Sequence, residues 1–445
     1  MSQDLTKGKP FFTILKFAVP VIGGNLFQLF YTLADSVIVG RTLGADALAA
    51  VGSTSIFIYL ILCFIQGITG GFGICLGHYF GAGDQKRIRQ SVLTSVILCS
   101  LFSIVLTVIC CVFSRQILNW MQTPAEIYDM AYDYMFAVLL GTGATVFYNM
   151  ISNILRALGD SRTPLFFLVF SSILNIALDV IFIVPLGMGV AGAAWATVLS
   201  QLLSAIMSMA SGMKKYKIFC FQKTDFIGIR GEIPAHLKIG FPMGFQMSVM
   251  CIGQLAMQGA VNALGAEAIA GYTAATKVDQ ISVLVNTAFG IAVSNFVAQN
   301  YGAGLAERIK KGFMACLCQA SIVNIGMGMV MIFYSHMIVP LFVEHPTKEI
   351  IEYSNGYLLT VSPFYFILGI LVICRSTIQS IGNSWAPFIA CIVELVLRVV
   401  ATTVLAKSVG YIGVCFATPL AWIGASIFLI PIYWQYAYFK RREIV

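Results

Sequence analysis

Long apolar stretches dominate this sequence. Twelve of them follow one another between polar turns, and each is at least as long as the ~20 residues with which a helix crosses the ~30 Å hydrocarbon layer of a bilayer. With 59% hydrophobic and 10% charged residues, the chain is predicted to be an all-α polytopic membrane protein. The stretches are too long for the ~10-residue strands of a β-barrel. The twelve expected spans are 14–40, 48–76, 90–113, 130–155, 164–185, 189–212, 239–262, 270–298, 311–334, 353–379, 386–406 and 411–437.

Lysine and arginine residues are divided unevenly between the two sets of alternate loops. Twenty lie in the set that includes both termini, and four lie in the other set, namely Arg41, Arg115, Lys348 and Lys407. Because positive charge favours the cytoplasmic side, both termini are expected in the cytoplasm and the protein in the plasma (inner) membrane. The basic residues are scattered rather than gathered in one patch, which argues against nucleic-acid binding.

Four sequence blocks occur twice, in the same order and at offsets of 221 or 223 residues. Such regular recurrence predicts a tandem duplication. The expected organisation is an amino-terminal six-helix lobe at 1–212, a cytoplasmic linker at 213–238 and a carboxy-terminal six-helix lobe at 239–445. Six spans in each half make the repeats parallel, an arrangement that usually encloses a central substrate path. The paired blocks are LGADALAA and LGAEAIAG at 43 and 264, FGAGDQKRIR and YGAGLAERIK at 80 and 301, LGDSRTP and IGNSWAP at 158 and 381, and GVAGAAWAT and GYIGVCFAT at 189 and 410.

Polar side chains of the amino-terminal half fall at one depth in the membrane. A carboxylate such as Asp35 costs at least ~2.5 kcal/mol within a span, so it should face protein or water. Asn175 and Asp179 are four residues apart and share a helix face. At ~1.5 Å per residue, Asp35, Asp179 and Thr197 lie about 9–12 Å from the outer ends of their spans. Together the four residues suit a shared proton or a Na+ ion; the alternative is a hydrogen-bond network that only fixes helix packing.

The carboxy-terminal half has other polar residues within its spans. Glu394 and Arg398 are four residues apart and are predicted to pair on one helix face, for a structural or a functional purpose. Lys277 and Asp279 are two apart, cannot face each other, and either orient groups near a cavity or serve the structure. Further candidates for cavity or structural roles are Gln28, Gln246 and Gln254. Met243, Met247, Met250 and Met257 form a stripe that suits packing or a promiscuous binding surface.

These features resemble the multidrug and toxic compound extrusion (MATE) transporters. The resemblance covers essentially the whole chain and rests on the 6 + 6 repeat, LGADALAA after the first span, the Gly-Ala-Gly turns and LRALGDSRTP before the fifth span. It implies two six-helix lobes arranged as a V and antiport of organic, often cationic, compounds against H+ or Na+. By position, Asp35 in LADSVIVG, Asn175 and Asp179 in NIALD, and Thr197 in WATVLS match the amino-lobe cation site of the DinF-like branch.

The NorM-like branch of that family, in contrast, has acids in its seventh and tenth spans. Here the seventh span offers only Gln246, Gln254 and Gln258, and the tenth contains no acid. The coupling ion, H+ or Na+, is therefore expected to bind in the amino-terminal lobe.

Missing motifs argue against other functions. The chain lacks G-x-x-x-x-G-K-[ST], so ATP is not expected to drive transport, and it lacks H-E-x-x-H and G-x-S-x-G, so no enzyme is expected. A flippase for lipid-linked oligosaccharides, from the same superfamily, is the alternative, although its cavity should hold many cationic residues. A passive channel fits the duplicated lobes less well. The expected partners are small organic substrates and the lipid bilayer, with no cofactor or bound metal, and the protein is expected to act as a monomer.

Overall fold

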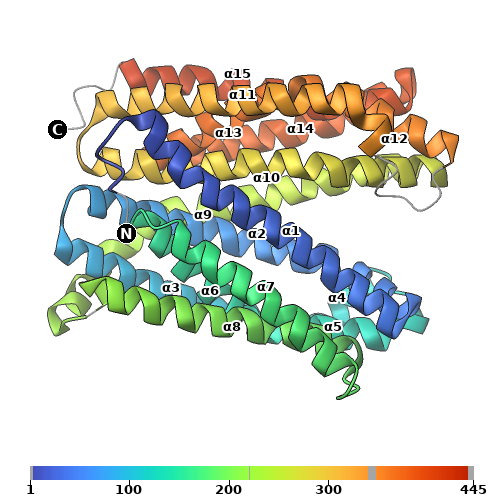
Figure 1. Ribbon diagram of the computed structural model, residues 1–445, viewed down its shortest axis with the longest axis horizontal. Coiled ribbons are helices and arrows are strands. Elements are labelled where there is room, and N and C mark those ends of the chain that lie inside the picture. The colour runs from blue at the N-terminus through green and yellow to red at the C-terminus, as the bar shows by residue number, and fades with distance from the viewer. Residues whose placement is uncertain (1–3, 220, 339–346, 439–445) are drawn as a thin grey trace. The chain divides into compact units, whose positions relative to one another are not determined.

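The computed structural model describes residues 4–219, 221–338 and 347–438, and within these ranges it contains helices and no strands. Figure 1 shows their course. The α-helices are α1 (Pro10–Leu43), α2 (Ala45–Gly81), α3 (Gln85–Val112), α4 (Ser114–Trp120), α5 (Tyr128–Leu140), α6 (Thr142–Ala157), α7 (Arg162–Ile183), α8 (Gly189–Lys215), α9 (Lys223–Asn262), α10 (Ala266–Gly302), α11 (Ala306–Ile338), α12 (Lys348–Val361), α13 (Tyr365–Ser380), α14 (Trp385–Val409) and α15 (Tyr411–Tyr438). Short 3-10 helices lie at Ala125–Ile127, Lys217–Phe219 and Ser362–Phe364.

Membrane-spanning length is reached by most of these helices. Within the described ranges, 11 spans are long and apolar enough to cross a bilayer, one of which, Lys348–Ser380, joins α12 to α13, and a bent pair raises the number to 12. The bent pair joins Ala125–Leu140 to Thr142–Ala157 at an angle of 44°, where a single straight span at 130–155 was expected. The all-α polytopic fold predicted from the sequence is thus confirmed.

The chain forms two compact units. The first consists of Met1–Asp4 and Gly23–Gly244, and the second of Leu5–Ile22 and Phe245–Val445. We call them the amino-terminal and carboxy-terminal units. Both α1 and α9 contribute to the two units, so the structure divides the chain inside these helices, whereas the sequence repeats divide it at 213–238. The segment expected as a linker is largely helical, because α9 begins at Lys223.

Turn glycines bear out the internal duplication. Gly83 has φ 74° and Gly304, 221 residues later, has φ 70°. This left-handed conformation suits glycine because it has no Cβ. The same agreement holds for Gly44 and Gly265, Gly159 and Gly382, and Gly189 and Gly410. The repeated blocks thus occupy equivalent turns of the two halves, as their composition predicts.

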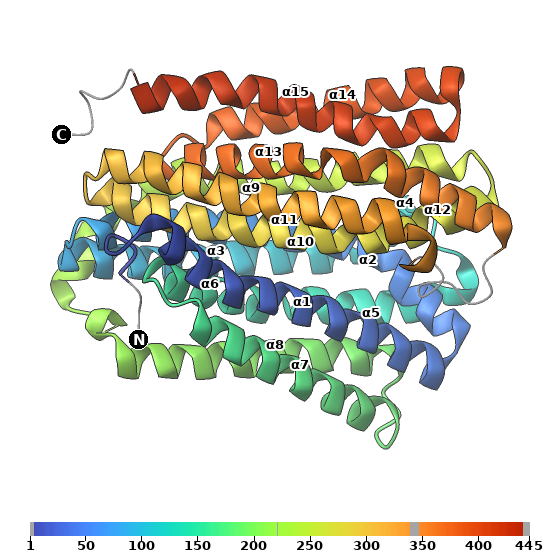
Figure 2. The same ribbon diagram turned by 45° about the horizontal axis from the view of Figure 1, so that its top comes forward.

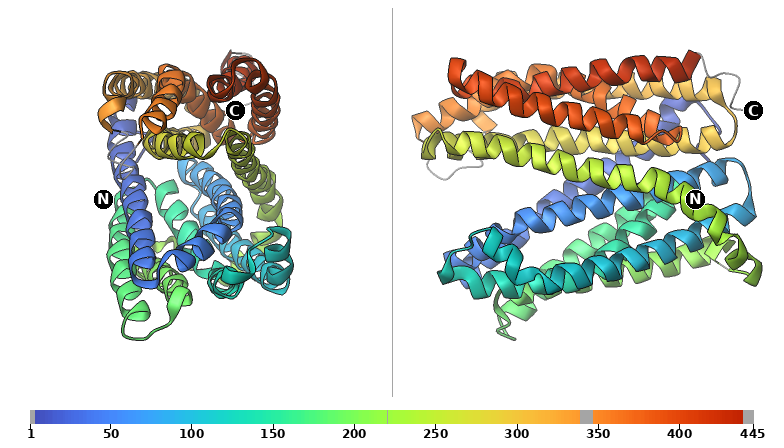
Figure 3. Two further views of the ribbon diagram at one scale, coloured as in Figure 1. Left: turned by 90° about the vertical axis from the view of Figure 1, so that its right-hand side faces the viewer. Right: turned by 180° about the vertical axis from the view of Figure 1, so that it is seen from behind.

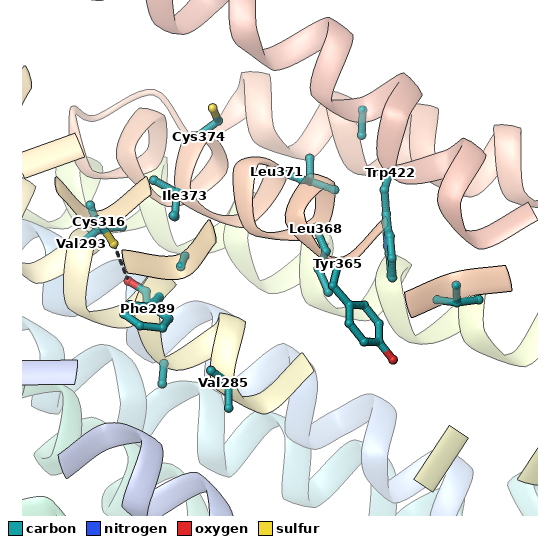
Figure 4. Close-up of a cluster of buried hydrophobic side chains, with 14 of the residues drawn as sticks. Val285, Phe289, Val293, Cys316, Tyr365, Leu368, Leu371, Ile373, Cys374 and Trp422 are labelled. Carbon is teal, nitrogen blue, oxygen red and sulfur yellow. Dashed lines mark hydrogen bonds between the residues drawn. The ribbon is translucent and has the colours of Figure 1, made fainter. Parts of the chain in front are cut away.

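Each unit is built from helices packed along their lengths. In the amino-terminal unit, α7 and α8 lie side by side, as Figures 1 and 2 both show. In the carboxy-terminal unit, α14 and α15 form the corresponding pair, visible in the right panel of Figure 3. The apolar core of this second unit includes Phe289, Tyr365 and Cys374 (Figure 4). The Tyr365 hydroxyl points away from the apolar side chains drawn there.

Glycines allow the first part of α9 to pack closely on α2. A Cβ atom on Gly71 would lie 2.6 Å from the Cα of Gly240, and one on Gly67 would lie 2.6 Å from the Cα of Gly244. Both pairs have the four-residue spacing that lets membrane helices approach each other. On α3, the Ser91 hydroxyl lies 2.9 Å from the imidazole Nε2 of His236. These contacts hold the start of α9 within the amino-terminal unit.

Candidate functional site

Small residues bring α1 close to α7, and this contact positions Asp35. A Cβ atom on Gly24 would lie 3.3 Å from Leu168, and one on Gly23 would lie 4.0 Å from Leu165. Asp35 lies eleven residues beyond Gly24, three helical turns further along the same helix. The two adjacent glycines of α1 thus allow close packing on α7, which helps to bring Asp35 of the first span near the fifth span.

The four predicted cation-site residues come together inside the amino-terminal unit. The Asn175 amide donates a hydrogen bond to the Thr197 hydroxyl at 3.3 Å. Asp35 and Asp179 are near enough to interact with each other electrostatically. Asn175 and Asp179 are buried, with 1% and 0% of their surface exposed, whereas Asp35 and Thr197 are half-buried. The four side chains, from three helices, therefore form one polar cluster, as expected from their equal depth in the membrane. The role of this cluster as an ion site remains a prediction.

This polar group has more hydrogen-bond acceptors than donors. No donor among the described residues reaches Oδ1 of Asp35, Oδ1 of Asn175 or either carboxylate oxygen of Asp179. Ionised carboxylates only accept hydrogen bonds, so the two neighbouring acids need a proton or a cation between them. A network that only fixed helix packing would be expected to satisfy its buried acceptors. The arrangement therefore favours binding of a proton or cation.

A small polar cavity adjoins the site. Its volume of ≈ 20 Å³ is room for about one water molecule. Gln28, one of the predicted cavity residues, lines it together with Asn175. The other lining residues are Tyr31, Tyr148, Leu168, Ser171, Ser172, Ser200 and Gln201. Tyr31 and Gln201 could not be selected from the sequence, because a single Tyr or Gln in a span is common and their convergence depends on how α1 and α8 pack.

In the carboxy-terminal unit, the predicted Glu394 and Arg398 pair is present, at 2.8 Å between Glu394 Oε1 and an Arg398 Nη atom. A third residue that the sequence reading missed joins them. Arg375 on α13 contacts the other oxygen of Glu394 at 2.7 Å. A lone arginine in the apolar run ILVICRST of the tenth span was the available signal, although its partner on α14 could not be deduced from spacing.

The remaining polar candidates of this unit have separate environments. Asp279 is buried and accepts a hydrogen bond from the Tyr357 hydroxyl at 3.2 Å. Lys277 is exposed on the same helix, and no ion pair of its side chain occurs in the part of the chain that the structure describes. Gln246 is buried and accepts from Gln379 at 2.5 Å, and Gln254 is exposed. Lys277 and Asp279 thus do not pair, as expected from their spacing.

With the fold and both polar groups described, comparison with known proteins becomes informative. The MatE family model matches residues 20–181 and 242–404, which cover most of the chain in two successive copies. The chain belongs to the MatE family. It is therefore a membrane transporter rather than an enzyme, as its motifs indicate. The two matched segments also coincide with the two halves of the sequence repeat.

Relatives of this MatE protein match over nearly its whole length. The probable multidrug resistance protein YpnP of Bacillus subtilis is 28% identical over 444 residues, with 100% of this chain and 99% of the relative covered. The probable multidrug resistance protein NorM of Thermotoga maritima is 26% identical, with 92% and 88% covered. A protein named FAD transporter, of Shewanella oneidensis, is 22% identical, with 92% and 90% covered.

Solved structures share the fold of this MatE protein. An outward-facing multidrug resistance MATE family transporter of the MOP superfamily superimposes with a TM-score of 0.90 at 23% identity, covering 99% of this chain and 98% of the other. A MATE in complex with MaL6 also gives a TM-score of 0.90, at 22% identity, covering 99% of this chain and 98% of the other. At such identities the likeness concerns the fold alone.

Proposed function

We propose that this protein is a secondary active antiporter that exports organic, often cationic, compounds in exchange for H+ or Na+. The coupling ion binds at Asp35, Asn175, Asp179 and Thr197. The observation that carries this proposal is the group of four buried acceptor oxygens without donors, on Asp35, Asn175 and Asp179. Relatives named multidrug resistance proteins support an export function for organic compounds.

The two acids, Asp35 and Asp179, can exchange a bound organic cation for the coupling ion. When both carboxylates are ionised, their charge attracts a cation. One proton held between them supplies the missing donor and removes one negative charge. An organic cation and the coupling ion thus compete for the same negative charge, and a tenfold preference of one state for the ion corresponds to about 1.4 kcal/mol. A Na+ ion would be held by the same carboxylates together with the oxygens of Asn175 and Thr197.

The charge distribution supports an orientation for this transport. We propose that the chain lies in the plasma membrane with both termini in the cytoplasm, because positively charged loops stay on that side. The carboxy-terminal Lys440, Arg441 and Arg442, which contribute to this argument, lie outside the described residues. We also propose that a single chain is the functional unit, since both halves of the duplication are present in it.

Transport driven by one ion at a time tests the proposal. Purified full-length protein is reconstituted in proteoliposomes, and uptake of ethidium, a permanent organic cation, is followed under a pH gradient or a Na+ gradient alone. We expect one gradient to drive uptake. Asp35→Asn and Asp179→Asn should lower the driven rate at least about tenfold, because each removes a charge worth about 1.4 kcal/mol or more to the coupling.

The matched control is Asp46→Asn, which changes an exposed acid at the start of α2 and should leave uptake unchanged. Normal driven uptake by well-folded Asp35→Asn would contradict the amino-terminal ion site. Uptake that follows neither gradient would contradict antiport itself.

A further inference from the structure

The charged cluster of the carboxy-terminal unit contains more positive than negative charge. Arg375 and Arg398 share one carboxylate, Glu394, at 2.7 and 2.8 Å. The three side chains are 6%, 9% and 5% exposed. Two guanidinium groups thus share one carboxylate within membrane-spanning helices. Charged groups in such a place are costly and mark a functional site by default.

Hydrogen-bond donors in this cluster lack acceptors. The Nε atoms of Arg375 and Arg398 and the amide nitrogen of Gln246 are buried, and no acceptor among the described residues reaches them. Another nitrogen of Arg375, Nη1, contacts only the Met250 sulfur, at 3.4 Å, and a thioether is a weak acceptor. Both oxygens of Glu394 are already in use. The unmet hydrogen-bonding capacity is therefore that of donors.

The residues that carry these donors lie on three helices that contact one another. Gln246 and Met250 are one turn apart on α9, and they contact Gln379 and Arg375, which are one turn apart on α13. On α14, Arg398 lies against Gly253 of α9, where a Cβ atom would be 3.0 Å from its Nη1 atom. The absence of a side chain at Gly253 leaves the space that the guanidinium fills.

A nearby acid, Asp279, does not accept hydrogen bonds from these donors. Asp279 on α10 interacts electrostatically with Arg398, but its hydrogen bond comes from Tyr357. Its second oxygen, Oδ1, is reached by no donor among the described residues. Asp279 therefore contributes a nearby negative charge but accepts from none of the unfilled guanidinium donors.

The cluster occupies the repeat-related position of the amino-terminal site. α7 begins at Arg162 and α14 begins at Trp385, 223 residues later. The same offset relates Asn175 of the amino-terminal site to Arg398, since 398 − 223 is 175. One half of the duplication thus presents unfilled acceptors at this place, and the other presents unfilled donors.

We propose that the Arg375–Glu394–Arg398 cluster is a second binding site, which accepts a carboxylate group of a transported compound. The site rests on the proposed export function and extends its substrates from organic cations to zwitterions. A carboxylate matches the planar fork of an arginine and supplies the acceptors that the unfilled donors lack. It replaces the Met250 sulfur, whose flexible side chain can turn aside.

A pair of dyes that differ only in the carboxylate tests this site. Rhodamine B is a cation that also bears a carboxylate, and its ethyl ester is a cation alone. Fluorescence polarisation at pH 7 measures the affinity of purified full-length protein in nanodiscs for each dye. We expect rhodamine B to bind at least about tenfold more tightly, as a new charged hydrogen bond implies.

Variants then test whether the preference for rhodamine B over its ester depends on the Arg375–Glu394–Arg398 cluster. Arg375→Gln removes one of the two guanidinium groups and keeps the Glu394–Arg398 pair, so it should abolish the preference and leave the affinity for the ester within about twofold. Lys407→Gln, which removes an exposed positive charge in the last turn of α14, is the matched control and should retain the preference. Glu394→Gln leaves both arginines unpaired and should fail to fold stably, which explains why it is not used for binding. Thermal unfolding and gel filtration verify that each variant is folded.

Equal affinity of the wild type for the two dyes would contradict the proposed site. An equal loss of affinity for both dyes in folded Arg375→Gln would contradict it as well. If Arg375→Gln does not fold, sodium benzoate serves as a competitor for the wild type. Displacement of rhodamine B alone supports the site, and displacement of both dyes or of neither overturns it. Binding of the ester without preference for rhodamine B contradicts this site only, whereas binding of neither dye contradicts the proposed export function as well.

Discussion

At the scale of single residues, Asp160 shows how a side chain fixes a repeated turn. Its carboxylate accepts hydrogen bonds from the backbone nitrogen and the hydroxyl of Thr163, at 3.1 and 2.8 Å, and pairs with Lys215. Burial alone would raise its pKa, but the hydrogen bonds from Lys215 and Thr163 outweigh burial and hold the pKa of Asp160 below its ordinary value. In the second half, Asn383 accepts from the backbone of Ala386 at 3.2 Å. The turn is thus conserved between the halves, although the charge is not.

We expect Asp160→Asn to lower the free energy of unfolding at pH 7 by about 1–3 kcal/mol, because charged hydrogen bonds are lost. The folded pKa lies below the unfolded value of about 3.9. The stabilisation is therefore fully present above that value and is lost as the pH falls through the lower folded pKa. Thermal unfolding of wild type and variant in detergent, from pH 7 to pH 3, measures the difference between them. A difference that stays constant over this range would contradict the role of the charge.

At the scale of helices, the close contact of α2 and α9 depends on four glycines. We expect Gly71→Ala to destabilise the protein by about 1–3 kcal/mol, the usual cost of overpacking, because its Cβ would meet the Gly240 backbone at 2.6 Å. Backbone atoms, unlike a flexible side chain, cannot turn aside. Gly52→Ala on the same helix is the control, since nothing lies within 4 Å of its Cβ. Similar unfolding temperatures for the two variants would show that the helices are not held at this distance by Gly71.

Helices were largely predictable from the sequence because length and apolar composition decide where a chain can cross a bilayer. The departures have local causes that hydropathy does not register. The fourth span bends at Gly141, whose Cβ position is occupied by the Val198 side chain. Asp35 and Asp179 could be placed at one depth by counting residues, because helix rise is constant. Arg375 could not be joined to Glu394, since that contact depends on how α13 and α14 pack.

At the scale of the whole molecule, one duplicated fold has acquired two kinds of chemistry. In the amino-terminal unit, Asp35 and Asp179 leave acceptors unfilled, and in the carboxy-terminal unit, Arg375 and Arg398 leave donors unfilled. Asn175 and Arg398 mark the same place in the two repeats. Duplication preserves turns and helix lengths because each half must insert and pack. The residues that face the interior of each half are free to diverge, so a repeat in sequence does not predict a repeated site.

This division of chemistry predicts how binding of an organic cation depends on pH. Tetraphenylphosphonium has no titratable group, so any pH dependence of its affinity belongs to the protein. We expect its affinity for the purified protein to fall as the pH drops from 8 to 5, because a proton taken up between Asp35 and Asp179 removes one of the negative charges that attract the cation.

Asp35→Asn and Asp179→Asn should each flatten the curve of affinity against pH, since a lone carboxylate has no partner with which to share a proton. Asp46→Asn, which changes an exposed acid at the start of α2, should leave the shape of the curve unchanged. A wild-type affinity that is constant with pH but falls on addition of Na+ would assign sodium to the same oxygens, and one that responds to neither ion would show that the amino-terminal acids do not couple transport.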